Sequence, residues 1–383
     1  MIKEAFPLKY WRGYLVAAIF AAMTWGLAEF AKSHWELVDM VYPYVTRLIQ
    51  NYLVNWSSGV SICLWQLLLM AAGVLVLASI VLMIIFKWNP IQWFGWVVAA
   101  VAIAGFLNTA LVGLNDYAGP IAKDIRLNVT DYNLAELEAA GTFYRDKANE
   151  LAQQVSRNSD GTVKYPEFKV LAEQAGAGFK TQTYDRFNSV FAGSTAPVKE
   201  LGWSDLFAGR GITGITVGIT GEAAVNPKTP AVALPFVMCR EMAKRMCITN
   251  PQDAAFAAYL ACDANTAVEF QYAGYLMAYR YCYDAVSSLD TSVAKGSLVR
   301  LKQGENGRLQ ADLEVYNSSF AALKNDNYVT GEDTIGSQRS HVVDLLVSWH
   351  IQEYVQPQMV EEEILFDPLD ETQVDLTGLP NVG

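Results

Sequence analysis

Three long apolar segments constrain this chain more than any other feature of its sequence. They cover residues 13–31, 59–86 and 91–115, and the last two contain no charged side chain. Each of those two is long enough to cross a hydrocarbon core about 30 Å thick. The whole chain is 52 % hydrophobic over 383 residues, which is too apolar for a purely soluble protein of this length. We therefore predict three transmembrane helices and a lipid bilayer as a partner.

The first segment has two interpretations, a cleaved signal peptide or a retained helix. Its apolar run is followed by Trp25, Glu29, Phe30 and Lys32, which form no small-residue cleavage pattern. Two further apolar segments then follow. The sequence therefore predicts a retained helix.

The basic residues beside the segments predict the orientation. Four basic residues lie on one side of the predicted membrane, namely Lys3, Lys9, Arg12 and Lys87. Only two, Lys32 and Arg47, lie in the loop on the other side. Basic residues favour the cytoplasmic side of a membrane. We expect a multi-pass protein of the cell membrane with a cytoplasmic N-terminus and an extracytoplasmic C-terminal domain.

Charge is distributed unevenly along the chain. Of its 28 Lys/Arg and 39 Asp/Glu, six and four lie in residues 1–115, which gives a net charge of +2 there and −13 beyond residue 115. An acidic external domain repels polyanions, so the composition argues against a nucleic-acid partner.

The pattern predicts a mainly α fold with three parts. Residues 1–115 form a membrane domain, residues 116–356 a mostly helical extracytoplasmic domain with a small β element, and residues 357–383 an acidic C-terminal tail. Glycine and threonine interleave with isoleucine and valine between residues 209 and 225, which favours a strand or hairpin. Helices are expected over residues 130–155, 166–175, 231–247, 250–263 and 267–289, and again near residues 309 and 340.

The segment between the first two apolar stretches is aromatic and amphipathic. Its apolar residues recur at helical spacing from Trp35 to Trp56, and Pro43 is expected to break the helix. Such a segment suits the outer membrane surface. Packing against the external domain explains the same pattern, and both alternatives stay open.

Five cysteines give a limited redox signal. Cys63 belongs to an apolar segment, and Cys239, Cys247, Cys262 and Cys282 lie in apolar helical sequence. Cysteine is among the most buried residue types, which favours buried free thiols. A disulfide such as Cys239 to Cys262 is the alternative that an external location permits.

One helical turn carries the frame of a zinc-peptidase signature without its histidines. In His-Glu-x-x-His, the two histidines hold the metal from one helix face and the glutamate acts as general base. The corresponding stretch here reads Arg240-Glu241-Met242-Ala243-Lys244, and Asp253 follows nine residues later at the place of an acidic third ligand. Arginine has no lone pair to offer a metal, and protonated lysine is a poor ligand.

Two interpretations of this turn compete. In the first interpretation, the arginine, the glutamate and the lysine simply form a charged helix face that is exposed to solvent. However, residues 232–239 are apolar and small, and buried charges in such a setting need partners. We therefore expect Arg240 and Lys244 to replace the charge of a zinc ion and to pair with Glu241 and Asp253. His34, His341 and His350 are too dispersed to share a metal through one helix face.

Several stretches in combination resemble one bacterial family, named for a domain of unknown function, 3810. They are GITVGITGE at 214–222, LPFVMCREMAK at 234–244, AAFAAYLAC at 254–262, QYAGYL at 271–276 and VVDLL at 342–346. The resemblance implies a membrane-anchored zincin-like peptidase. It places Arg240 and Lys244 at the ligand histidines, Glu241 at the general base and Asp253 at the third ligand. Zinc is then the family's expected cofactor, and none is expected here because both histidines are replaced.

Three functions follow from this sequence. The leading hypothesis is a catalytically inactive pseudo-metallopeptidase with a binding or regulatory role at the cell envelope, where it recognises a peptide or envelope protein. The second is an active hydrolase with unusual ligands or a metal-free acid pair of Glu241 and Asp253. The third is a structural membrane subunit, since small residues in the second and third segments allow close helix contact.

Overall fold

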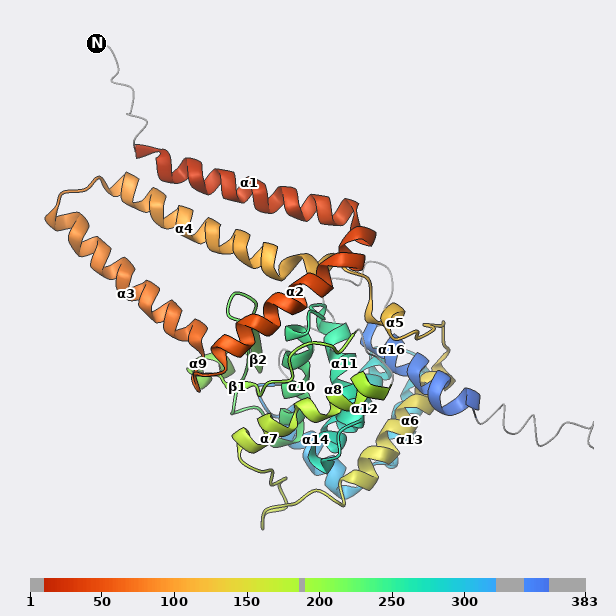
Figure 1. Cartoon of the computed structure of the whole chain (residues 1–383). Helices are drawn as coiled ribbons and strands as arrows, with labels where there is room; N and C mark the ends of the chain where they lie inside the picture. The colour runs from red at the N-terminus through yellow and green to blue at the C-terminus, as the bar shows by residue number, and fades with distance from the viewer. Residues whose placement is uncertain (1–9, 186–189, 322–340, 358–383) are drawn as a thin grey trace, which may run out of the picture.

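The computed structural model describes residues 10–185, 190–321 and 341–357. It is 70 % helix and 4 % strand, with a small three-stranded sheet, so the predicted mainly α fold is confirmed. The predicted acidic tail lies almost entirely outside the described residues. In Figure 1, three long helices extend from a compact helical body.

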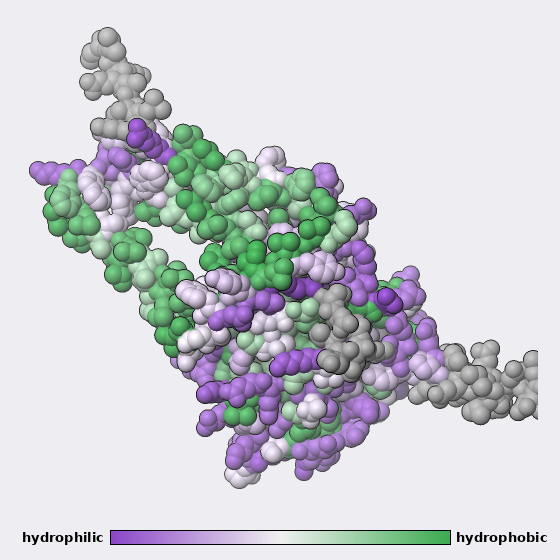
Figure 2. Space-filling view, viewed as in Figure 1, coloured by the Kyte–Doolittle hydropathy of each residue, from purple (hydrophilic) through white to green (hydrophobic). Residues whose placement is uncertain are grey.

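The three long helices coincide with the predicted apolar segments. They are α1 (Arg12–Ser33), α3 (Leu64–Ile85) and α4 (Pro90–Leu111), and each is long and apolar enough to cross a membrane. Asn89 caps α4 by accepting hydrogen bonds from the backbone N–H groups of Ile91 and Gln92. Figure 2 shows apolar residues concentrated on these helices and polar residues over the body. Their composition and length indicate insertion into a membrane.

The three helices do not form an even bundle. In Figure 1, α1 lies along α4, whereas α3 diverges from them to make a V. Glycine permits the close approach of α1 and α4, because a Cβ atom on Gly13 would lie 2.4 Å from the carbonyl carbon of Gly95. The small residues of the second predicted segment are exposed instead of packed: Ala71, Ala72, Gly73 and Ala78.

A fourth long helix, α2 (Trp35–Ser57), joins α1 to α3. The expectation that Pro43 breaks this segment is wrong, because Pro43 lies inside one helix. A proline removes one backbone hydrogen bond of a helix, but the contacts of Tyr42 and Pro43 with their surroundings hold this part of α2 in place. The Tyr42 hydroxyl donates to the carbonyl of Ala110 at 2.8 Å, and Pro43 itself is buried.

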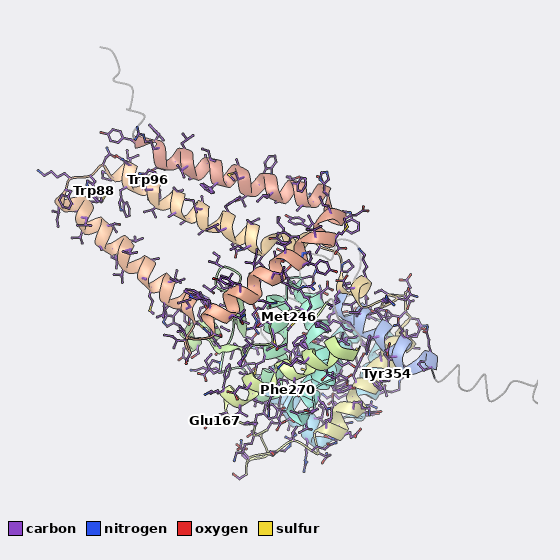
Figure 3. All side chains as sticks on the ribbon, in the orientation of Figure 1. Trp88, Trp96, Glu167, Met246, Phe270 and Tyr354 are labelled. Atoms are coloured by element: carbon purple, nitrogen blue, oxygen red, sulfur yellow. The ribbon has the colours of Figure 1, made fainter. Side chains whose placement is uncertain are left out.

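The body is a helical core built around α10 (Leu234–Arg245), α11 (Pro251–Asp263) and α12 (Val268–Ser287). Asn250 caps α11 with Pro251 in its first turn, as predicted. Figure 3 labels Met246 and Phe270 within this body, and both are fully buried. Two more helices complete the core, α6 (Leu134–Leu151) and α16 (His341–His350), and α16 continues into a short π-helical turn, Ile351–Val355.

The predicted hairpin is present and belongs to a small sheet. Strands β2 (Gly214–Val217) and β3 (Glu222–Val225) pair antiparallel, with Gly214 opposite Val225. Gly221 has φ +68°, a conformation that glycine adopts easily in such a turn. A strand that the sequence did not predict, β1 (Lys199–Glu200), pairs parallel with β3 and gives the order β1-β3-β2.

The helix predicted over residues 166–175 is followed directly by a second helix, which starts at Gly176. Helix α7 (Phe168–Gln174) is followed at once by α8 (Gly176–Asp185). Glycine is needed there for packing, since a Cβ atom would lie 2.7 Å from the carbonyl oxygen of Thr195. Shorter or peripheral helices complete the body: η2 (Gly113–Tyr117), α5 (Ile121–Asp124), α9 (Ser204–Ala208), η3 (Ala231–Ala233), α13 (Ser292–Gln303) and α14 (Gly307–Asn317).

All five cysteines are buried free thiols, in agreement with the favoured alternative. Cys63, predicted within a span, instead precedes α3 as its N-cap residue. The Cys239 to Cys262 disulfide is not formed. Burial, together with the neighbouring Cys239 thiol, raises the pKa of Cys262 well above its usual range, so its thiol stays protonated.

Candidate functional site

The candidate site is built on α10, where it packs against the β2–β3 hairpin. The last two turns of α10 carry Arg240, Glu241 and Lys244, which we call the charged cluster. The Glu241 side chain has no exposed surface, while those of Arg240 and Lys244 are 9 % and 21 % exposed. An ordinary solvated helix face is therefore excluded, and the buried charges need partners.

Those partners are within the cluster itself. Glu241 Oε1 accepts hydrogen bonds from Lys244 Nζ at 2.9 Å and from Arg240 Nη2 at 3.2 Å. Thr216 on β2 places its Oγ1 3.0 Å from Glu241 Oε2. Both cations therefore point inward onto the carboxylate, as predicted.

The hairpin leaves room for this carboxylate only because of a glycine. A Cβ atom on Gly214 of β2 would lie 2.5 Å from Glu241 Cγ. Any other residue at position 214 would displace the glutamate or the strand. The glycine-rich sequence of the hairpin is thus linked directly to the geometry of the cluster.

The charges of the cluster shift one another's pKa values. Burial by itself raises the pKa of Glu241, but the positive charges of Lys244 and Arg240 and their hydrogen bonds outweigh it, so the pKa lies below its usual range. Burial lowers the pKa of Lys244, although the charge of Glu241 opposes this shift. Burial by itself lowers the pKa of Arg240, but Glu241 together with the nearby Tyr281 and Tyr316 outweighs it, so the pKa is raised. Glu241 is therefore an ionised carboxylate at neutral pH.

A small hollow of about 30 Å³ lies next to the cluster. Arg240 Nη2 also donates to Thr213 Oγ1 at 2.8 Å on the wall of this hollow. Two cations of the cluster thus border a space large enough for a water molecule or a single small polar group. Its other lining residues include Gly211, Gly214, Gln252, Ala255 and Tyr281.

Asp253 does not join the cluster, so the predicted ion pairs between it and the two cations are wrong. Its carboxylate accepts a hydrogen bond from the backbone N–H of Ile121 at 3.2 Å and lies 3.0 Å from His341 Nε2. Successive residues on a helix point about 100° apart, so the neighbours Gln252 and Ala255 line the hollow while Asp253 faces the linker after α4. The sequence spacing thus placed Asp253 on the helix after α10, as the structure does, but it predicted the wrong direction for the Asp253 side chain.

The residues of the cluster do not fit a zinc ion. Zinc requires lone pairs from histidine, cysteine or carboxylate, and arginine supplies none. Within residues 10–185, 190–321 and 341–357, no group of three or more histidine, cysteine, aspartate or glutamate side chains is placed to hold a metal. What the arrangement offers chemically is a buried, positively bordered hollow beside a strand.

The three histidines lie far from the cluster or pack against other groups. His34 stacks on the ring of Phe30, and burial lowers the pKa of His350, which packs against Phe143. His341 pairs with Asp253. These contacts place the three histidines against different groups.

Sequence reasoning missed the polar residues that complete the site. Thr213 and Thr216 hold Arg240 and Glu241, and Gln252 lines the hollow. The available signal was weak: threonine recurs through the predicted hairpin, but alternation alone does not tell which face meets α10.

Comparison with known proteins identifies the family. The chain matches the sequence model of a family described as "Protein of unknown function (DUF3810)" over residues 38–338, well over half its length. That match ends before α16, although the stretch at 342–346 contributed to the resemblance. Searches of the curated proteins and of the solved structures found no match. The chain belongs to the DUF3810 family.

Proposed function

We propose that this protein is a membrane-anchored, zincin-like pseudopeptidase that binds a ligand at the cell envelope and does not hydrolyse it. One observation carries the proposal. Glu241, at the position of the general base, is buried and bonded to both residues that stand at the ligand-histidine positions. With its N-terminus in the cytoplasm, the protein would hold this site outside the cell.

The geometry opposes general-base chemistry at Glu241. A general base must be able to accept a proton from a bound water, and it works best when its pKa lies near the working pH. Glu241 is held by Arg240, Lys244 and Thr216, and its pKa is lowered. A carboxylate in this environment is a weak base with no open position for a metal-bound water.

The same geometry favours recognition of a peptide. Within the described part of the sheet, β2 is an edge strand, and its first residue borders the hollow beside Arg240 and Lys244. An extended peptide can add to an exposed strand edge through backbone hydrogen bonds. An acceptor group of that peptide, such as a carbonyl or carboxylate oxygen, would then meet the two cations.

The active-hydrolase alternative would need either a metal or an acid pair. Because Asp253 faces Ile121 and His341, the acid pair of Glu241 and Asp253 has no support in this geometry. The structural-subunit alternative has a different basis, the exposed small residues of α3, and it predicts a stoichiometric membrane partner on purification.

Metal analysis tests the proposal. The full chain, purified in detergent after expression with added zinc, should contain no stoichiometric zinc, and one zinc ion per chain would overturn the assignment. The double variant Arg240→His/Lys244→His supplies two ligands, and adding Gln252→Glu supplies a third from the residue that faces the hollow. We expect the triple variant to bind zinc more tightly than the double variant. The matched control, Asp253→Glu in the double variant, should give no gain, because that side chain points elsewhere.

A further inference from the structure

Helix α2 has the opposite polarity from a helix on a water-soluble domain. Its buried side carries polar residues, including Thr46, Arg47, Gln50 and Ser57. Its exposed side is almost entirely apolar or aromatic, and Glu36 and Asn55 are the polar exceptions. A helix that faces water shows the reverse pattern. The exposed apolar and aromatic residues are Trp35, Leu37, Met40, Val41, Tyr44, Val45, Leu48, Tyr52 and Trp56.

The polar side of α2 is fixed to the body by specific contacts. Gln50 Nε2 donates to the carbonyl of Gly218 at 2.9 Å, at the tip of the β2–β3 hairpin. Thr46 Oγ1 lies 3.3 Å from Cys247 Sγ, and Lys199 Nζ donates to the carbonyl of Ser57 at 2.8 Å. These contacts fix the second half of the helix, from Thr46 to Ser57, so the helix cannot rotate to hide its apolar side.

The position of α2 shows what meets that apolar side. It starts at Trp35, directly after α1 ends at Ser33, and α3 follows at Leu64. In Figure 1, α2 lies across the wide end of the V between α3 and α4, with the body on its other side. Between α3 and α4, a groove of about 820 Å³ is lined largely by apolar residues such as Leu69, Leu75, Val97 and Val101. The apolar face of α2 thus continues the apolar surfaces of the spans.

We propose that α2 lies in the membrane interface, with its exposed face in the lipid of one leaflet and its polar face on the body. Its 23 residues make a helix roughly 35 Å long at 1.5 Å per residue. Trp35 and Trp56 stand near its two ends, and tryptophan and tyrosine favour the boundary between headgroups and acyl chains. Acyl chains then fill the space between α3 and α4.

Lipid suits this face better than a second copy of the chain. The face is continuous with three helices that themselves have the composition of membrane spans, so burying it in lipid needs no separate partner. An interfacial α2 also brings the hairpin to the membrane surface. A Cβ atom on Gly221 would lie 2.9 Å from Leu53 Cβ, so the tip of the hairpin rests on α2.

Spin-label accessibility tests this placement on the full chain in phosphatidylcholine vesicles. Cysteine is introduced at Leu48 or Tyr52, which are 71 % and 75 % exposed, and the matched control is Val293 on α13, which is 65 % exposed. The native cysteines are buried, so the label attaches to the introduced residue. We expect labels at 48 and 52 to collide strongly with oxygen and weakly with a water-soluble nickel chelate, and the label at 293 to show the reverse.

Two results would overturn the proposal. Free access of the nickel chelate to positions 48 and 52 would place the face in water. Weak collision with both reagents would show that protein covers it. Because both side chains are exposed, the substitutions leave the core intact, and Met40→Cys on the same face, with 64 % exposure, supplies a third position if one variant is poorly produced.

Discussion

Among the described residues, two glutamates are buried, on opposite faces of the hairpin, and their carboxylates have different partners. Glu222 on β3 accepts hydrogen bonds from Lys199 Nζ at 2.6 Å and from the backbone N–H groups of Leu64 and Trp65 at 2.8 and 2.9 Å. Glu241 on α10 instead receives two cations and a hydroxyl group. The Glu222 carboxylate faces one positive charge and the start of a helix, whereas the Glu241 carboxylate faces two positive charges and the hydroxyl group of Thr216.

This difference separates a structural acid from the carboxylate of the candidate site. The first backbone N–H groups of a helix have no intrahelical partner. A carboxylate at that end accepts hydrogen bonds from them and also interacts favourably with the positive end of the helix dipole. Glu222 thus explains how α3 docks onto the sheet. Glu241 caps no helix, and it joins two cations of its own helix to Thr216 of the hairpin. Under the proposed function, this cluster takes the place of a metal site.

The largest expected effect comes from Glu241→Gln. The substitution removes the buried negative charge that both Arg240 and Lys244 contact, which should lower the free energy of unfolding by about 3 to 5 kcal/mol. Denaturant unfolding in detergent micelles measures this loss. Glu314→Gln, at an exposed position, is the control and should have little effect. A loss for Glu241→Gln as small as that of the control would show that the cluster is not a buried ionic group.

Glu222→Gln should lower the free energy of unfolding by a smaller amount, about 1.5 to 3 kcal/mol, because the amide oxygen of glutamine still accepts one hydrogen bond. Lys199 also keeps the carbonyls of Ser57 and Ile62, at 2.8 and 3.2 Å. Hydrogen exchange should become faster specifically at the amides of Leu64 and Trp65. Unchanged hydrogen exchange at these two amides would contradict the structural role of Glu222. A loss of unfolding free energy as large as that of Glu241→Gln would contradict the proposed difference between the two glutamates.

The pH dependence of stability should be the smallest and most gradual effect. The pKa of Glu241 is lowered in the folded protein, so its contribution is complete above its unfolded pKa of about 4.3 and disappears as the pH falls through the lower folded value. The difference in stability between the wild type and Glu241→Gln should therefore become smaller as the pH falls. Thermal unfolding of both proteins between pH 7 and pH 3 measures it, and a constant gap would contradict an ionised Glu241.

Much of the architecture could be predicted because its signals are local. Uncharged apolar runs predict α3 and α4, and Asn250 followed by Pro251 predicts the start of α11. The continuation of α2 through Pro43 and the start of α8 at Gly176 could not be predicted. In both places, contacts with distant residues decide whether a residue that usually ends a helix does so.

By itself, the sequence determined that three helices suit a membrane, that a helical body follows them, and that Arg240, Glu241 and Lys244 share one helical turn. Only the tertiary structure decided that Asp253 faces away from the two cations that contact Glu241. It also decided that the polar side of α2 is buried and its apolar side exposed. The physical reason is the same in each case: helical spacing fixes which residues share a face, but packing against other elements decides what that face meets.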